Sequence, residues 1–93
     1  MATIRVGDAL NDFLKSARWQ NRINEIRIQG EWPKIMGATI AKYTRSVLLK
    51  EGTLIITTDV AALKQELHFG KQQIINNVNE YFKDTVVKDV VVK

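Results

Sequence analysis

The spacing of apolar residues changes along this chain, and the order of the changes limits the folds it can adopt. Apolar side chains recur at helical spacing up to about residue 37, alternate with polar ones over about 40–58, and return to helical spacing as far as residue 82. A valine-rich run over 86–92 follows, which favours a strand. With 93 residues, residues 1–93 are expected to form a single domain with one modest core.

Two helices are predicted in the first part of the chain. The first spans about 8–17, and Asp8 can cap its amino-terminal end. The second spans about 20–37, with Pro33 expected to kink it or to begin a new turn and Gly37 expected to end it. The core-facing side of this second helix is marked by apolar residues at positions i, i+4 and i+7: Ile28, Trp32 and Ile35. Ile23 and Ile26 are expected to extend this apolar side.

A β-hairpin and a long helix are predicted next. The hairpin arms cover 40–50 and 53–58, and Gly52 supplies a positive φ in the turn between them. The helix that follows keeps its apolar phase as far as Phe82, and Gly70 marks a position where it bends or breaks.

The predicted order is α-α-β-β-α-β, which indicates an α+β fold with helices packed on one face of a three-stranded sheet. The hairpin strands are antiparallel, and the last strand is expected to run parallel to one of them through a right-handed crossover. Alternation places apolar residues on both faces of the sheet. The face away from the helices is therefore open to a partner, to weak self-association, or to a few solvent-exposed apolar residues.

Composition argues against several classes of function. The chain has no cysteine and one histidine, so neither thiolate chemistry nor a metal site is expected. The carboxylates are scattered, and neither a nucleophile motif nor a phosphate-binding loop occurs, so we expect no catalytic residues, no cofactor and no small-molecule substrate. No signal peptide is recognised and no apolar run is long enough to span a bilayer, so we expect no contact with membranes.

The positive charge lies in the first half of the chain. Residues 1–50 contain nine Lys and Arg against four Asp and Glu, whereas residues 51–93 contain five against six. A polyanion such as nucleic acid is therefore expected to bind the first half. The candidate nucleic-acid-binding residues are Lys15, Arg18, Arg22, Lys42, Arg45 and Lys50.

The first three of these cations share one helix face only if the helix continues through Trp19, because they are spaced at i, i+3 and i+7. They form either a phosphate-binding stripe or a solvated helix face. The other three lie along the first hairpin arm, where Tyr43 either stacks a base or is half-buried in the sheet. Trp19, at the expected junction of the two helices, and Tyr43 are the candidate partner-binding residues.

Four short segments, in this order and spacing, resemble the DciA-like family. They are EWPKIMG at 31–37, IAKYT at 40–44, GTL at 52–54 and LKQEL at 63–67, and the resemblance extends from about residue 8 to residue 92. It implies a K-homology-like domain in the bacterial cytoplasm that associates with the replicative DNA helicase. It also implies DNA binding and help in loading the helicase onto single-stranded DNA.

One feature of common K-homology modules is missing. Those modules use a G-x-x-G loop to bring the backbone close to nucleotide phosphates, and no such loop occurs here. Three functions therefore stay open. The chain is a replication module that binds the helicase and single- or double-stranded DNA, an RNA-binding K-homology-like module, or a purely structural protein-interaction domain.

Overall fold

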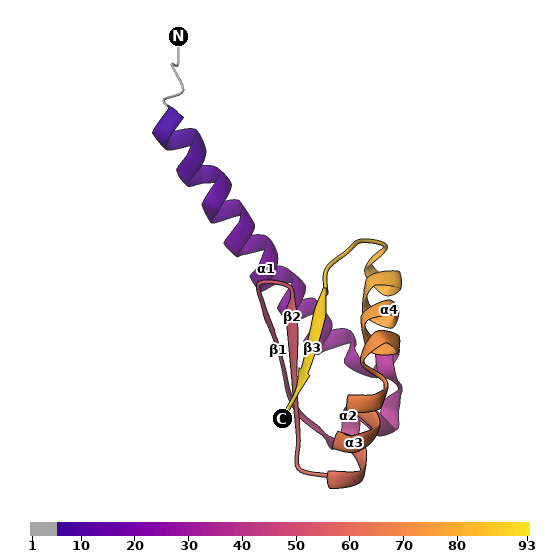
Figure 1. Cartoon of the computed structure of the whole chain (residues 1–93). Helices are drawn as coiled ribbons and strands as arrows, with labels where there is room; N and C mark the ends of the chain where they lie inside the picture. Colours follow the sequence, from indigo (N-terminus) through magenta and orange to yellow (C-terminus); the bar gives the residue numbers. More distant parts are fainter. Residues whose placement is uncertain (1–5) are drawn as a thin grey trace.

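The computed structural model describes the backbone of residues 6–93 and the side chains from residue 18 onward. The elements are, in order, α1 (Val6–Met36), α2 (Ala38–Tyr43), β1 (Thr44–Lys50), β2 (Thr53–Thr58), α3 (Ala61–Phe69), α4 (Lys71–Phe82) and β3 (Asp89–Val92). Helices cover one face of the three strands, with α3 and α4 stacked end to end beside the sheet (Figure 1). The α+β class predicted from the sequence is confirmed.

The three strands form one mixed sheet in the order β1-β2-β3. Strands β1 and β2 are the predicted antiparallel hairpin, and Gly52 in its turn has φ 84°. Strand β3 pairs parallel with β2 after the two helices, which confirms the expected parallel pairing of the last strand. Strand β1 is therefore one edge of the sheet, and β3 is the other.

A single apolar core lies between the sheet and the helices. Helix α1 contributes Ile28 and Trp32, which are 0% and 3% exposed, so the prediction that they face the core is confirmed. Ile23 and Ile26, expected on the same side, are exposed, because Asn21 and Glu25 of this stretch face β1 instead. Each fully buried aliphatic side chain contributes about 1.5–3 kcal/mol to folding. The other members of the core come from every strand and from α3 and α4: Val47, Leu49, Leu54, Ile56, Leu63, Leu67, Ile74, Val78, Val87, Val90 and Val92.

The prediction of two helices before residue 37 was wrong. A single helix, α1, continues through Trp19 and includes Pro33 close to its carboxyl-terminal end. The apolar pattern is interrupted over about 20–25 although the helix is not, because the side chains there that face the body are polar. They hydrogen-bond to the backbone of β1 instead of entering the apolar core.

The first arm of the hairpin was predicted too long. Residues 40–43 belong to the short helix α2, which begins after Gly37, and β1 starts only at Thr44. Gly37 has φ 95° and ψ 154°, a combination that only glycine adopts readily, and it separates α2 from α1. The Thr44 hydroxyl accepts a hydrogen bond from the Trp32 indole N–H and donates one to the Ile40 carbonyl, which ties the start of β1 to both helices.

The last two predicted elements also changed at their ends. The sequence predicted that the long helix bends or breaks at Gly70. It breaks there, into α3 and α4. The last strand begins at Asp89 and not at residue 86, because the backbone N–H groups of Val86 and Val87 donate to Asn79 Oδ1 at 2.9 and 2.8 Å. An α4 side chain thus binds the backbone that the valine-rich sequence assigned to a strand.

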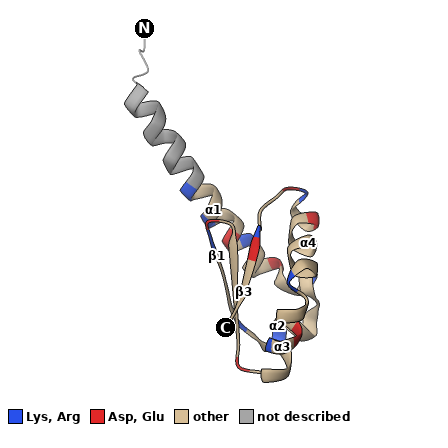
Figure 2. Ribbon diagram, in the orientation of Figure 1, with Lys and Arg blue, Asp and Glu red and all other residues tan. Residues whose placement is uncertain are grey.

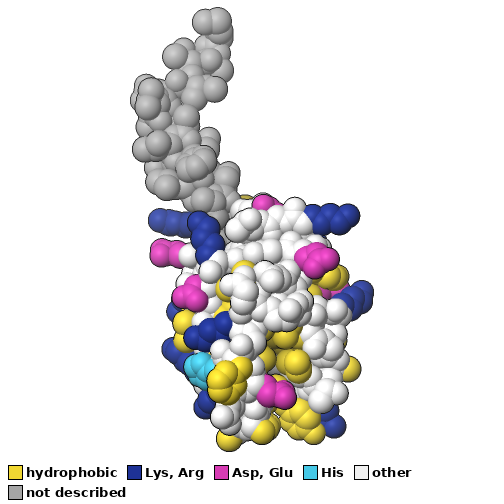
Figure 3. Space-filling view, turned by 45° about the vertical axis from the view of Figure 1, so that its right-hand side comes forward, with side chains coloured by type: hydrophobic (Ala, Val, Ile, Leu, Met, Phe, Trp, Pro, Cys, Tyr) yellow, Lys and Arg dark blue, Asp and Glu magenta, His cyan; other side chains and the backbone are white. Residues whose placement is uncertain are grey.

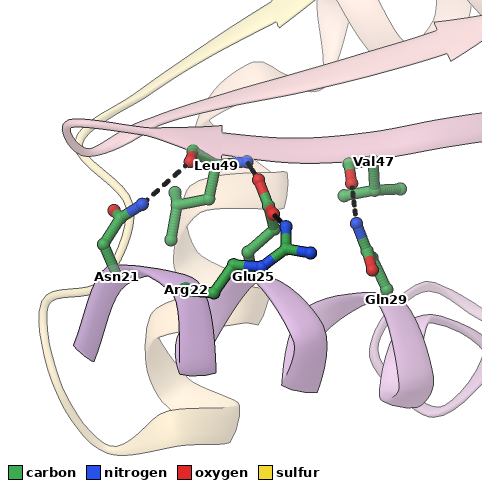
Figure 4. A network of polar contacts seen from close by, with 6 residues as sticks. All are labelled: Asn21, Arg22, Glu25, Gln29, Val47 and Leu49. Carbon is green, nitrogen blue, oxygen red and sulfur yellow. Dashed lines mark hydrogen bonds and ion pairs between the residues drawn. The ribbon is translucent and has the colours of Figure 1, made fainter. Parts of the chain in front are cut away.

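A row of polar side chains on α1 binds the free edge of β1 (Figure 4). Asn21 Nδ2 donates to the Leu49 carbonyl at 3.1 Å, Glu25 Oε2 accepts from the Leu49 N–H at 2.9 Å, and Gln29 Nε2 donates to the Val47 carbonyl at 2.8 Å. The buried Glu25 carboxylate also pairs with the Arg22 guanidinium. These contacts occupy backbone groups that an edge strand otherwise presents to another chain.

We predict that Glu25→Ala destabilises the fold by about 1–3 kcal/mol, because it leaves the buried Leu49 N–H without an acceptor. Glu25→Gln keeps an acceptor oxygen and loses only the pairing with a largely exposed arginine, so it should lose less than about 1 kcal/mol. Urea unfolding followed by circular dichroism measures both. Glu80→Ala, at an exposed position of α4, is the control, with a change within about 0.5 kcal/mol. Equal losses for the two Glu25 variants would contradict the role of the acceptor.

The same substitution should have opposite effects at two glycines. Gly37→Ala is expected to destabilise by about 1–3 kcal/mol, because its backbone is strained for any residue with a Cβ. Gly30→Ala should stabilise by up to about 1 kcal/mol, because Gly30 lies inside α1 and alanine favours helix. A new Cβ would meet nothing within 4 Å at either position, so packing does not obscure the comparison. Urea midpoints that move in the same direction would refute this account.

Candidate nucleic-acid interface

Two of the predicted cations from distant parts of the sequence line one hollow. Arg18 of α1 and Lys50 at the end of β1 border it together with Asn21, Leu49 and Glu51. Figure 2 shows the blue segments of α1 and of the hairpin close together at this end of the body. We call this site the tip hollow. Neither cation forms an ion pair within the part of the chain whose side chains are described.

The α1–β1 hydrogen bonds place the two sides of the tip hollow. Asn21, one turn after Arg18, bonds to the carbonyl of Leu49, the residue before Lys50. The sequence therefore supplies the cations, and the pairing of helix with strand brings them together. An exposed pair of cations beside backbone and amide groups can attract two phosphates of a nucleic-acid backbone without reading its sequence.

A third cation near the hairpin turn was not identified from the sequence. The Lys88 side chain lies beside Gly52, since a Cβ built on Gly52 would meet its carbons at 3.5–3.7 Å, and the Lys88 N–H donates to the Gly52 carbonyl at 2.7 Å. Lys88 is in the half of the chain with the lower positive charge, far along the sequence from the turn. Only the parallel pairing of β3 with β2 reveals its position.

The other two cations of the predicted helical stripe do not add a described, unpaired charge to the tip hollow. Arg22 is exposed over 60% of its side chain, but its guanidinium pairs with the buried Glu25 carboxylate. Lys15 is within α1, and its side chain lies outside the described residues.

Two of the three cations predicted on the first hairpin arm, Lys42 and Arg45, form a separate group with Tyr43. Lys42 and Tyr43 end α2 and are not on a strand, so the expected strand platform for Tyr43 was wrong. The Lys42 ammonium lies 5.6 Å from the centroid of the Tyr43 ring, and that tyrosine is 47% exposed. Arg45 pairs with Asp59 at 3.1 Å, with both side chains largely exposed. This group, named here the α2–β1 group, lies at the other end of β1, where Arg45 borders a second hollow.

A β-bulge explains the orientation of Arg45. The pairing of β1 with β2 shifts between Thr44 and Ser46, so Arg45 is the extra residue. Regular alternation along β1 would place Arg45 on the same face as Val47 and Leu49, which are buried, whereas Arg45 is exposed. The bulge turns it toward Asp59, and that pairing lowers its availability for phosphate.

Elsewhere, positive and negative side chains are mixed. On the face drawn in Figure 3, lysine and arginine are dispersed among aspartate and glutamate. One exposed pair links α1 to α4, because the Tyr81 hydroxyl donates to Glu31 at 2.8 Å. This hydrogen bond, with the nearby Lys34 ammonium, lowers the pKa of Glu31, and the same hydrogen bond raises the pKa of Tyr81. At the tip hollow, Arg18 and Lys50 come from separate elements and neither is in an ion pair with a described side chain, although Glu51 also borders the hollow.

The two tryptophans differ in environment. Trp32 is a core residue whose indole N–H is satisfied by Thr44, whereas Trp19 lies in the middle of α1 and is 69% exposed. Within residues 6–93, no helix is long and apolar enough to cross a bilayer. The described residues also contain no cluster of three or more side chains that could hold a metal ion.

Comparison with known proteins identifies the family. The model of the DciA family, described as the DnaC/DnaI antecedent, matches residues 5–92. The chain belongs to the DciA family. By its name, this is the helicase-loading family antecedent to DnaC and DnaI, so the resemblance stated from four short segments is confirmed.

Curated relatives of this DciA-family chain include proteins of Mycobacterium and Corynebacterium. A UPF0232 protein of Mycobacterium marinum is 26% identical over 73 residues, which cover 78% of this chain and 39% of the relative. A UPF0232 protein of Corynebacterium glutamicum is 26% identical over 85 residues, covering 91% of this chain and 48% of the relative. The chain thus spans less than half the length of these relatives. No solved structure matches it significantly.

We predict that reversing the tip hollow weakens DNA binding more than reversing the α2–β1 group. Arg18→Glu with Lys50→Glu should lower the affinity for all DNA sequences alike and reduce the slope of log K against log salt by about 1 per residue. Lys42→Glu with Arg45→Glu is the matched control, with the same change in charge. Fluorescence anisotropy with a duplex of about 20 base pairs at ~50 mM salt measures both. Equal losses would show that net charge, and not the tip hollow, determines binding.

Proposed function

We propose that this chain is a non-enzymatic accessory module of DNA replication that binds the replicative DNA helicase and DNA in the bacterial cytoplasm and assists helicase loading. The match of the DciA family model to residues 5–92 carries this proposal. The tip hollow supports the DNA component, because Arg18 and Lys50 both border it and neither is in an ion pair with a described side chain.

The physical role of the DNA contact follows from its chemistry. Two or three cations at one end of a small body give weak, salt-sensitive binding that does not depend on sequence. Such binding can hold this chain, together with a bound helicase, near single-stranded DNA. It does not compete with the tighter binding of DNA by the helicase itself. A specific protein contact must then supply the affinity for the helicase.

An RNA-binding module receives less support from the structure. The turn between α3 and α4 contains a single glycine, Gly70, whose Cβ position is already 3.3 Å from the Glu66 carbonyl. Two bare glycines that would admit a nucleotide backbone are not present there. Preferential binding of short single-stranded RNA over DNA of the same sequence would reverse this ranking.

The decisive measurement is retention of the chain on immobilised cognate replicative helicase, with competitor DNA in excess. We expect retention at low micromolar concentrations of the chain. The Arg18→Glu and Lys50→Glu double variant is the control for bridging through DNA, and it should be retained as well as the wild type because the protein contact is direct. Absence of wild-type retention at these concentrations would contradict the proposed function.

A further inference from the structure

Helix α1 carries an apolar stripe on its outer side. Trp19, Ile23 and Ile26 are 69%, 43% and 52% exposed, although residues of this type are usually buried. Ile28 and Trp32, on the inner side of the same helix, are in the core. No described element packs on the outer side of this part of α1 (Figure 1). The stripe therefore has no function in the core of the chain.

The spacing of the stripe matches the seam of a two-helix interface. Trp19, Ile23, Ile26 and Gly30 are separated by four, three and four residues, the pattern by which one helix places side chains into the gaps of another. Gly30 has open space around its Cβ position, so the backbone of a second helix can approach closely at that end. An exposed tryptophan at the other end supplies the kind of anchor that dominates binding energies.

The charges on both sides of this stripe are basic. Arg22 lies along one side, and Arg27 and Lys34 lie along the other. The acids of the described part of α1, Glu25 and Glu31, are directed to β1 and α4, where they bond to Leu49 N–H and to the Tyr81 hydroxyl. They partly neutralise Arg22 and Lys34. Arg27, held over the Phe82 ring at 4.5 Å, is the cation without a paired acid.

These charges select the occupant of the stripe. If two copies of this chain paired through it in parallel, Arg22 of one copy would face Arg27 of the other, and an antiparallel pair would bring together basic and amide side chains only. A parallel pair of copies is therefore disfavoured by repulsion and an antiparallel pair gains no ion pair, whereas a helix with acidic flanks can pair with the basic residues on both sides of the stripe. We propose that the outer face of α1 docks an amphipathic helix of a partner protein whose apolar stripe is flanked by aspartate or glutamate.

This inference deepens the proposed function, because it names the chemistry of the protein contact that helicase association requires. The probe is a synthetic peptide of about three heptads with leucine in its seam and glutamate on both flanks, compared with a peptide that carries lysine in place of glutamate. Anisotropy of the labelled peptides is measured against the full chain. We expect micromolar binding of the glutamate peptide and at least tenfold weaker binding of the lysine peptide.

Substitutions then locate the binding. Ile23→Ser with Ile26→Ser should lower the affinity for the glutamate peptide at least tenfold. Val91→Ser, at a 36% exposed position on the open face of the sheet, should leave this affinity unchanged. Arg27→Glu should reduce the ratio between the affinities of the chain for the glutamate peptide and for the lysine peptide. Urea midpoints verify that each variant is folded. Equal binding of both peptides, no detectable binding of either, or insensitivity to the isoleucine substitutions would overturn the proposal.

Two further outcomes separate this inference from the proposed function. If the isoleucine variant loses the peptide but is still retained on the helicase, the helicase uses another surface and the inference fails while the proposed function stands. If the peptide binds as expected but the helicase retains no form of the chain, the proposed function fails and the docking surface stands. Sedimentation that shows a dimer of the chain alone, abolished by the isoleucine substitutions, would identify a second copy as the occupant and overturn the proposal.

Discussion

The hydrogen bonds between α1 and the free edge of β1 are the constraint on which the other features depend. Successive side chains four residues apart on a helix are about 6 Å apart along its axis, and alternate residues of a strand are ~6.6 Å apart. Asn21, Glu25 and Gln29 can therefore reach Leu49 and Val47 in succession. No buried side-chain nitrogen or oxygen among the described residues lacks a partner, so this polar seam lies beside the apolar core without a desolvation penalty from unpaired groups.

This seam gives three sides of one helix three different roles. The side that faces the sheet places Ile28 and Trp32 in the core, the side that faces β1 satisfies its backbone, and the opposite side leaves Trp19, Ile23 and Ile26 in solvent. It also sets Arg18 beside Lys50 at the tip hollow. The proposed DNA contact uses Arg18 of α1 together with Lys50 of β1, and the proposed protein contact uses another side of α1.

Sequence reasoning succeeded where a pattern is local and failed where a distant element overrides it. The hairpin turn at Gly52, the break at Gly70 and the core position of Trp32 follow from conformational preference and helical phase. The division of α1 was predicted wrongly, because polar residues that bind a strand edge resemble a helix junction. The valine-rich end was predicted too long as a strand, because Asn79 captures the N–H groups of Val86 and Val87.

The sequence by itself determined the α+β class, the family, and the concentration of positive charge in the first half, since composition, periodicity and short motifs are properties of the chain before it folds. Only the tertiary structure decided which cations meet, which are neutralised and which apolar residues stay in solvent. Arg45 pairs with Asp59 because of the β-bulge in β1. Lys88 reaches the hairpin turn because β3 pairs parallel with β2. Trp19 is exposed because another side of α1 binds β1. These are contacts between segments far apart in the chain, and their register is set by backbone hydrogen bonds that no local pattern of side chains specifies.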